Sequence, residues 1–118
     1  MSNIIQITIG QPEYIKSYLN VVTQGKLTDV EVLVLSKLIA KHLELQSEGL
    51  KGKYLNKILF SHEVRKEIYL DIKYTQQNFN NYFKSLKDKG AILENNNEYS
   101  LNEFLIPKEF ITFKWNIL

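Results

Sequence analysis

The residue types in this chain best suited to chemistry are side-chain amides that cluster after Thr75. On a helical wheel of about 100° per residue, Gln77, Asn81, Lys84 and Asp88 fall on one side, opposite Phe79. An amide carries both a hydrogen-bond donor and an acceptor, and asparagine or glutamine can pair with N6 and N7 of adenine in the major groove. This polar face therefore predicts recognition of base edges.

The predicted contact set includes this face, its flanks and the residues that lead into it. The lysines would contact phosphates and the amides would contact bases. The alternative is that this face is a solvated or protein-facing surface. Proteins from an AT-rich genome are rich in asparagine and lysine, so the same face could arise without selection for DNA binding. The predicted DNA-contacting residues are Lys73, Thr75, Gln76, Gln77, Asn78, Asn80, Asn81 and Lys84.

No pattern typical of catalysis or metal binding is present in the sequence. His42 and His62 lack a metal-ligand spacing, and the glycines near Lys53 lack the spacing of a phosphate-binding loop. The carboxylates are scattered, and without cysteine there is no thiolate chemistry. We therefore expect no enzymatic activity, no metal, no cofactor and no small-molecule substrate.

Length and composition predict one globular domain over residues 1–118. The chain has 44% hydrophobic and 24% charged residues, and no apolar run approaches the roughly 18 residues of a membrane helix. The N-terminus lacks signal-peptide features, so we expect a cytoplasmic protein without a membrane partner. The net charge is only +2, although residues 50–74 hold six bases against three acids. Such a local excess is a weak electrostatic indication of a polyanionic partner.

Capping signals and apolar spacing predict most of the secondary structure. Thr28 and Glu31 form a capping box, and Ser61 and Thr75 are further N-cap residues. Gly90 is suited to end the helix that follows Thr75. Residues 53–60 fit either a short helix or a strand. The helices expected on these grounds cover residues 13–23, 28–45, 62–71 and 75–89. In the third of these, Val64, Ile68 and Leu70 are expected to face the core.

Short strands are expected near the hairpin and at both ends of the chain. Residues 92–93 and 99–101 flank a tip at Asn95-Asn96-Asn97, and asparagine tolerates the positive φ of hairpin turns. Apolar residues alternate over residues 5–9 and again over residues 111–117. These terminal strands either pair with each other or pack against another subunit.

Residues 27–101 resemble a winged helix-turn-helix domain of the kind found in bacterial, plasmid and phage regulators and replication proteins. The resemblance implies an α+β fold with a three-helix core and a β-hairpin wing. Residues 1–26 would add an N-terminal strand and helix, and residues 102–118 a C-terminal strand. The matching motifs are Leu27-Thr28-x-x-Glu31, Thr75-Gln76-Gln77-Asn78-Phe79-Asn80-Asn81-Tyr82 and Leu86-Lys87-Asp88-Lys89-Gly90-Ala91-Ile92.

The hairpin tip departs from the pattern of DNA-binding relatives. Those proteins commonly carry arginine or lysine there, whereas this tip is flanked by Glu94 and Glu98. Carboxylates close to phosphates are repulsive, so this departure disfavours a wing that contacts DNA.

Two functions from different classes follow from these observations. The first is a sequence-specific protein that binds double-stranded DNA, a transcriptional regulator or replication accessory factor of phage or plasmid type. It would read the major groove with helix 75–89 and form a homo-oligomer, such as a dimer, through its terminal strands. The alternative is a non-enzymatic protein–protein adaptor or phage structural or assembly component with the same fold. The small net charge, the acidic wing and the apolar C-terminal segment favour that alternative.

Overall fold

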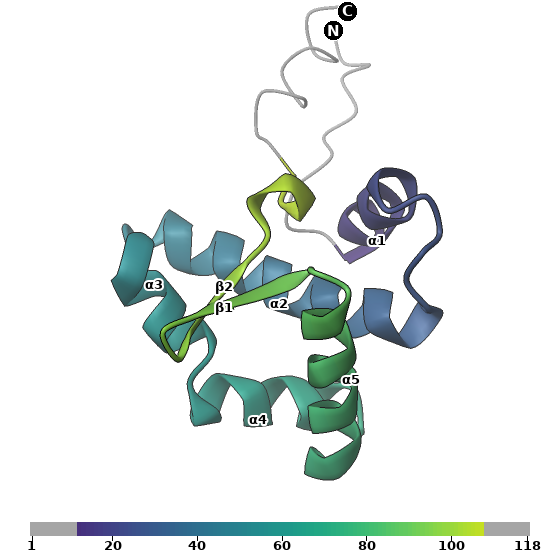
Figure 1. Cartoon of the computed structure of the whole chain (residues 1–118). Coiled ribbons are helices and arrows are strands. Elements are labelled where there is room, and N and C mark those ends of the chain that lie inside the picture. The colour runs from purple at the N-terminus through teal and green to yellow at the C-terminus, as the bar shows by residue number, and fades with distance from the viewer. Residues whose placement is uncertain (1–11, 108–118) are drawn as a thin grey trace, which may run out of the picture.

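The longest helix, α2, lies at the centre of the computed structural model, and the other elements pack around it (Figure 1). The structure describes residues 12–107, so the strands predicted over residues 5–9 and 111–117 lie outside the described residues. No helix within that range is both long and apolar enough to cross a membrane. The elements are α1 (Pro12–Val22), α2 (Asp29–Ser47), α3 (Gly52–Leu59), α4 (His62–Asp71), α5 (Gln76–Asp88), β1 (Ile92–Asn95), β2 (Glu98–Leu101) and the 3-10 helix η1 (Glu103–Leu105).

The described chain is a compact α+β domain in which five α-helices precede an antiparallel two-strand hairpin. Helix α2 supplies the centre of the core, where Val34, Leu35, Leu38 and Ile39 are fully buried. It is buried over a wide arc because α1, α3, α4 and α5 all pack on it. The amphipathic helices around it each contribute one apolar stripe, which is the usual way to close a small core.

The predicted N-caps are confirmed. In the capping box of α2, Thr28 Oγ1 accepts from the Glu31 amide at 3.2 Å, and Glu31 Oε1 accepts from the Thr28 amide at 2.8 Å. Ser61 Oγ accepts from the Val64 amide at 3.3 Å at the start of α4. Each cap satisfies an amide that has no partner inside its own helix, which fixes where the helix begins.

The segment over residues 53–60, which fitted either a helix or a strand, is helix α3. Leu55 and Leu59 are buried at i and i+4, so the helical period places both on one side against α2. Residues 27–101 therefore contain one helix more than the three-helix core that the sequence predicts. In α4 the expected inward positions of Val64 and Ile68 are confirmed, whereas the inward position of Leu70 was wrong: Leu70 is 59% exposed.

The hairpin forms at the predicted tip. Asn95 pairs with Glu98, and the two residues between them, Asn96 and Asn97, have φ of 54° and 65°. Positive φ at both central residues matches the twist of the flanking strands. In Figure 1 the hairpin runs between α5 and α3, and β1 packs on α5 whereas β2 packs on α3.

A buried carboxylate joins the start of α2 to the end of α5. Glu31 is only 2% exposed, and it accepts hydrogen bonds from Lys89 Nζ at 2.6 Å, from the Ser85 hydroxyl and from the Thr28 amide. Burial by itself would raise the pKa of this carboxyl. The donors from Lys89, Ser85 and Thr28 outweigh that effect and lower the pKa from 4.5 to about 2.

This pKa makes the stability of the fold depend on pH. A carboxyl whose pKa is lower in the folded state stabilises the protein above its unfolded pKa, and the contribution is lost as the pH falls from about 5 towards 2. Substitution of Glu31→Gln should therefore lower the free energy of unfolding at pH 7 by about 3 kcal/mol. The difference between the variant and the wild type should shrink at pH 3, as measured by urea unfolding followed by circular dichroism.

The control is Glu48→Gln, which alters an exposed residue after the end of α2 and should change the unfolding free energy by less than about 0.5 kcal/mol. A wild-type protein that loses no more stability than Glu31→Gln between pH 7 and pH 3 would contradict the role given to Glu31.

Candidate nucleic-acid interface

Helix α5 buries an aromatic face and leaves its amides in solvent. Phe79 and Leu86 are fully buried and Phe83 is 6% exposed, so this side of the helix is held in the core. Thr75 caps the helix by accepting from the Asn78 amide at 3.1 Å. All eight residues predicted to contact DNA are exposed: Lys73, Thr75, Gln76, Gln77, Asn78, Asn80, Asn81 and Lys84.

Five of these residues lie on three different sides of α5. Gln77, Asn81 and Lys84 follow one another at i, i+4 and i+7 along the outermost line of α5. Asn80 lies on the same side of the helix as Lys87, which pairs with Glu94 of the hairpin. Asn78 lies on the same side as Ser85, whose hydroxyl donates to Glu31 of α2. The structure thus brings three predicted residues into one line and directs Asn78 and Asn80 to opposite sides of it.

The amides on that line are available to a ligand. Gln77 Nε2 donates to Asn81 Oδ1 at 3.5 Å, which is the long limit of a hydrogen bond and holds neither side chain strongly. The first turn of α5 contains no acidic residue, whereas α1, α2 and α4 each have one or more there. The free amides at the start of α5 therefore have no carboxylate in that turn to compete with an incoming anion.

A tight turn over residues 72–75 sets the angle between α4 and α5. The Tyr74 amide donates to the Tyr69 carbonyl at 2.8 Å, and the Lys73 amide donates to the Leu70 carbonyl at 3.1 Å. These bonds close the end of α4 and require a left-handed residue at Lys73, whose φ is 63°. Gly90 has the equivalent place after α5, with φ of 81°. At Lys73 the side chain is thus kept at a position that ordinarily favours glycine.

Ion pairs neutralise the carboxylates nearest to the turn. Asp71 pairs with Lys37 at 2.8 Å, and Glu67 lies 3.5 Å from Lys41, so both acids are bound to lysines of α2. Within the described part of the chain, Lys73 and Lys84 form no ion pair, nor does Lys66 on α4. The positive charges around the α4–α5 turn are therefore free to act on an external ligand.

The hairpin is attached to α5 through aromatic rings and one ion pair. Tyr99 packs on Phe83 and Phe60 with ring centroids 5.2 Å and 5.7 Å apart. Glu94 pairs with Lys87 at 3.1 Å, and this hydrogen bond raises the pKa of Lys87. Of the two acids expected to repel phosphates, Glu94 is thus balanced by a lysine, whereas Glu98 forms no ion pair within residues 12–107.

Sequence reasoning missed the position of Arg65. Its guanidinium lies 5.5 Å from the centre of the Phe83 ring, so α4 places a cation on the aromatic cluster under the hairpin. Lys87 Nζ lies 5.3 Å from the Tyr99 ring in the same cluster. From the sequence, Arg65 contributes only to the local positive charge of residues 50–74. The sequence contains no signal that its guanidinium would pack on an aromatic ring of α5.

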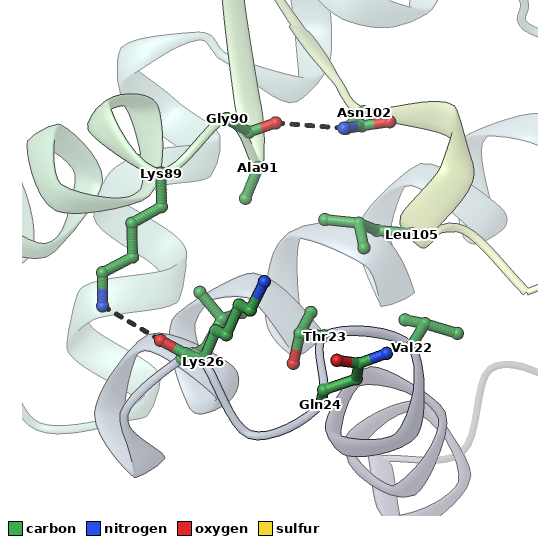
Figure 2. A pocket seen from close by; sticks show the side chains of 10 residues that line it. Val22, Thr23, Gln24, Lys26, Lys89, Gly90, Ala91, Asn102 and Leu105 are labelled. Carbon is green, nitrogen blue, oxygen red and sulfur yellow. Dashed lines mark hydrogen bonds between the residues drawn. The ribbon is translucent and has the colours of Figure 1, made fainter.

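A separate pocket of about 440 Å³ lies between the loop after α1, the end of α5 and the segment after β2 (Figure 2). Lys89 Nζ donates to the Lys26 carbonyl at 3.3 Å at one side, and Asn102 Nδ2 donates to the Gly90 carbonyl at 3.1 Å at the other. None of the eight predicted residues lines it. Over residues 12–107 the structure also contains no group of three side chains able to hold a metal ion.

Comparison of the chain with protein-family models, with curated proteins and with solved structures gives no match.

Two substitutions at the α4–α5 turn separate backbone strain from charge. Lys73→Gly removes the penalty of a side chain at φ of 63°, whereas Lys73→Ala keeps it, and both remove the ammonium group. The glycine variant should be more stable to unfolding than the alanine variant by about 1 kcal/mol, since the left-handed region costs a residue with a Cβ roughly that amount. Thermal unfolding measured by circular dichroism gives the comparison. Equal stability of the two variants would show that the turn does not hold Lys73 in this conformation.

Proposed function

We propose that this protein binds double-stranded DNA in a sequence-specific manner, with α5 in the major groove. The observation that carries the proposal is the outward line of Gln77, Asn81 and Lys84, supported from beneath by buried Phe79 and Phe83. Two amides about one helical turn apart, on a rigid helix, offer paired hydrogen bonds to adenine edges. Lys84, farther along the same line, would contact a phosphate.

The order of elements supports a winged helix-turn-helix arrangement. Helices α4 and α5 with the turn over residues 72–75 would form the helix-turn-helix, and β1 and β2 would form the wing. Helix α2 would be the supporting helix, and α3 an addition to the usual three. In this proposal the protein is a transcriptional regulator or replication accessory factor of phage or plasmid type that acts in the cytoplasm.

Electrostatics favour DNA at the turn but limit the affinity of one copy. Lys66, Lys73 and Lys84 form no ion pair within the described residues, whereas the acids Glu67, Asp71 and Glu94 are paired. Three phosphate contacts give only a modest electrostatic contribution to binding. A homodimer joined through the terminal segments would bind two half-sites about 34 Å apart and overcome this limit.

An adaptor or assembly role is the second candidate, and exposed apolar side chains favour it. Val21 on α1 is 74% exposed and Phe104 in η1 is 69% exposed. Glu98 also leaves an unbalanced negative charge beside the hairpin tip. Sedimentation velocity without DNA distinguishes the two functions, because a large stable assembly in the absence of DNA would support the adaptor role.

DNA binding is tested with fluorescently labelled random-sequence duplexes of 20 base pairs at low salt, followed by selection of the tightest binders. Asn81→Ala should weaken binding to the selected duplexes by about 1–3 kcal/mol and leave binding to the random pool nearly unchanged. Lys84→Ala and Lys73→Gly should weaken both, and each should reduce the slope of log K against log salt by about 1.

The matched controls are Asn20→Ala and Lys16→Ala, which remove an amide and a lysine from α1. Both should bind as the wild type does. Absence of duplex binding at low salt, or α5 variants that bind as tightly as the α1 controls, would refute the proposed function.

A further inference from the structure

Helix α3 presents a basic and aromatic face that the duplex-binding surface does not use. Tyr54 and Lys57 lie three residues apart along this face, Lys53 flanks them, and Lys51 is the N-cap residue directly before the helix. All four side chains are exposed, and Tyr54 is exposed to 76%. We call these four residues the α3 face.

The charge of the α3 face is uniform. No acidic residue occurs between Glu48 and Glu63 in the sequence, and α3 has none in its first turn. Strand β2, which packs against α3, begins at Glu98, yet none of the three lysines forms an ion pair with any carboxylate of residues 12–107. Three uncompensated ammonium groups, two on α3 and one on its N-cap residue Lys51, are complementary to a polyanion.

Tyr54 indicates which polyanion. Its ring makes no aromatic or cation–π contact with the described residues, and a tyrosine so exposed has most of its apolar surface in water. Tyr54 does not contribute to the core, because buried Leu55 and Leu59 are the residues that anchor α3 there. Phosphates of a duplex would satisfy the lysines but leave this ring exposed, since duplex bases are stacked on one another. An unpaired base can stack on the ring while its phosphates contact the lysines.

We propose that the α3 face is a binding site for single-stranded nucleic acid, in which Tyr54 stacks with a base and Lys51, Lys53 and Lys57 contact the backbone. The site is separate from the α5 surface, because the hairpin lies between α3 and α5 (Figure 1). It does not depend on duplex binding by α5, so either activity can be present without the other.

The test measures binding of the full chain to fluorescently labelled oligothymidylate of 15 nucleotides by anisotropy at low salt. Tyr54→Ala should weaken binding about tenfold, and Tyr54→Leu should weaken it similarly because leucine is apolar but cannot stack as a ring does. Tyr54→Phe should bind within twofold of the wild type. Replacement of Lys51, Lys53 and Lys57 by glutamine should reduce the salt slope by about 2.

Phe104→Ala is the matched aromatic control and Lys66→Gln the matched lysine control, and both should bind the oligonucleotide as the wild type does. All the altered side chains are exposed, so each variant should remain folded, which thermal unfolding would check. Asn81→Ala and Lys84→Ala should leave oligothymidylate binding unchanged, which separates this site from the proposed duplex site.

Three outcomes would overturn the assignment. The first is the absence of oligothymidylate binding at low salt. The second is equal weakening of duplex and single-strand binding by Tyr54→Ala, which would make the α3 face a part of the duplex site. The third is an effect of Tyr54→Ala on binding to vesicles of phosphatidylglycerol without any effect on binding to the oligonucleotide, which would indicate a membrane surface.

Discussion

The buried carboxylate of Glu31 is the interaction on which the rest of the structure depends. It completes the capping box at the start of α2, and it also accepts from Ser85 and Lys89 at the end of α5. A buried charge is tolerated only when it is paired and hydrogen-bonded, so α5 cannot move away from α2 without leaving Glu31 unsatisfied. The orientation of α5, and with it the direction of its amides, is thereby fixed from the end opposite to the predicted contact surface.

Aromatic packing fixes the other side of α5. Phe83 contacts Phe79, Phe60 and Tyr99, so one ring links α5 to the α3–α4 connection and to the hairpin. Rings of this size bury much apolar surface and have few rotamers, which makes them rigid supports for a helix whose outer side is wholly polar. The polar surface can therefore vary in sequence without loss of the fold, because none of its side chains contributes to the core.

The two proposed surfaces differ in what each supplies to a nucleic acid. Helix α5 combines paired amides with isolated lysines, which suits the edges and backbone of a duplex. Helix α3 combines an exposed ring with lysines on one face, which suits unpaired bases. The hairpin lies between the helices that carry the two surfaces, since β1 packs on α5 and β2 packs on α3. A protein with both surfaces would be able to bind at a junction between double-stranded and single-stranded DNA. A protein with only the α5 surface would bind a duplex operator site.

Local signals in the sequence determined where α2, α4 and α5 begin and which face of α5 is polar. Caps such as Thr28, Ser61 and Thr75 act within three residues, so a single sequence reveals them. Only the tertiary structure decided which distant side chains interact. Glu31 accepts a hydrogen bond from Lys89, 58 positions away, and ion pairs join Asp71 to Lys37 and Glu94 to Lys87. It also decided that residues 52–59 form a helix and that Leu70 is left in solvent. The physical reason is that backbone preferences are short-range, whereas burial and ion pairing depend on which side chains the fold brings together.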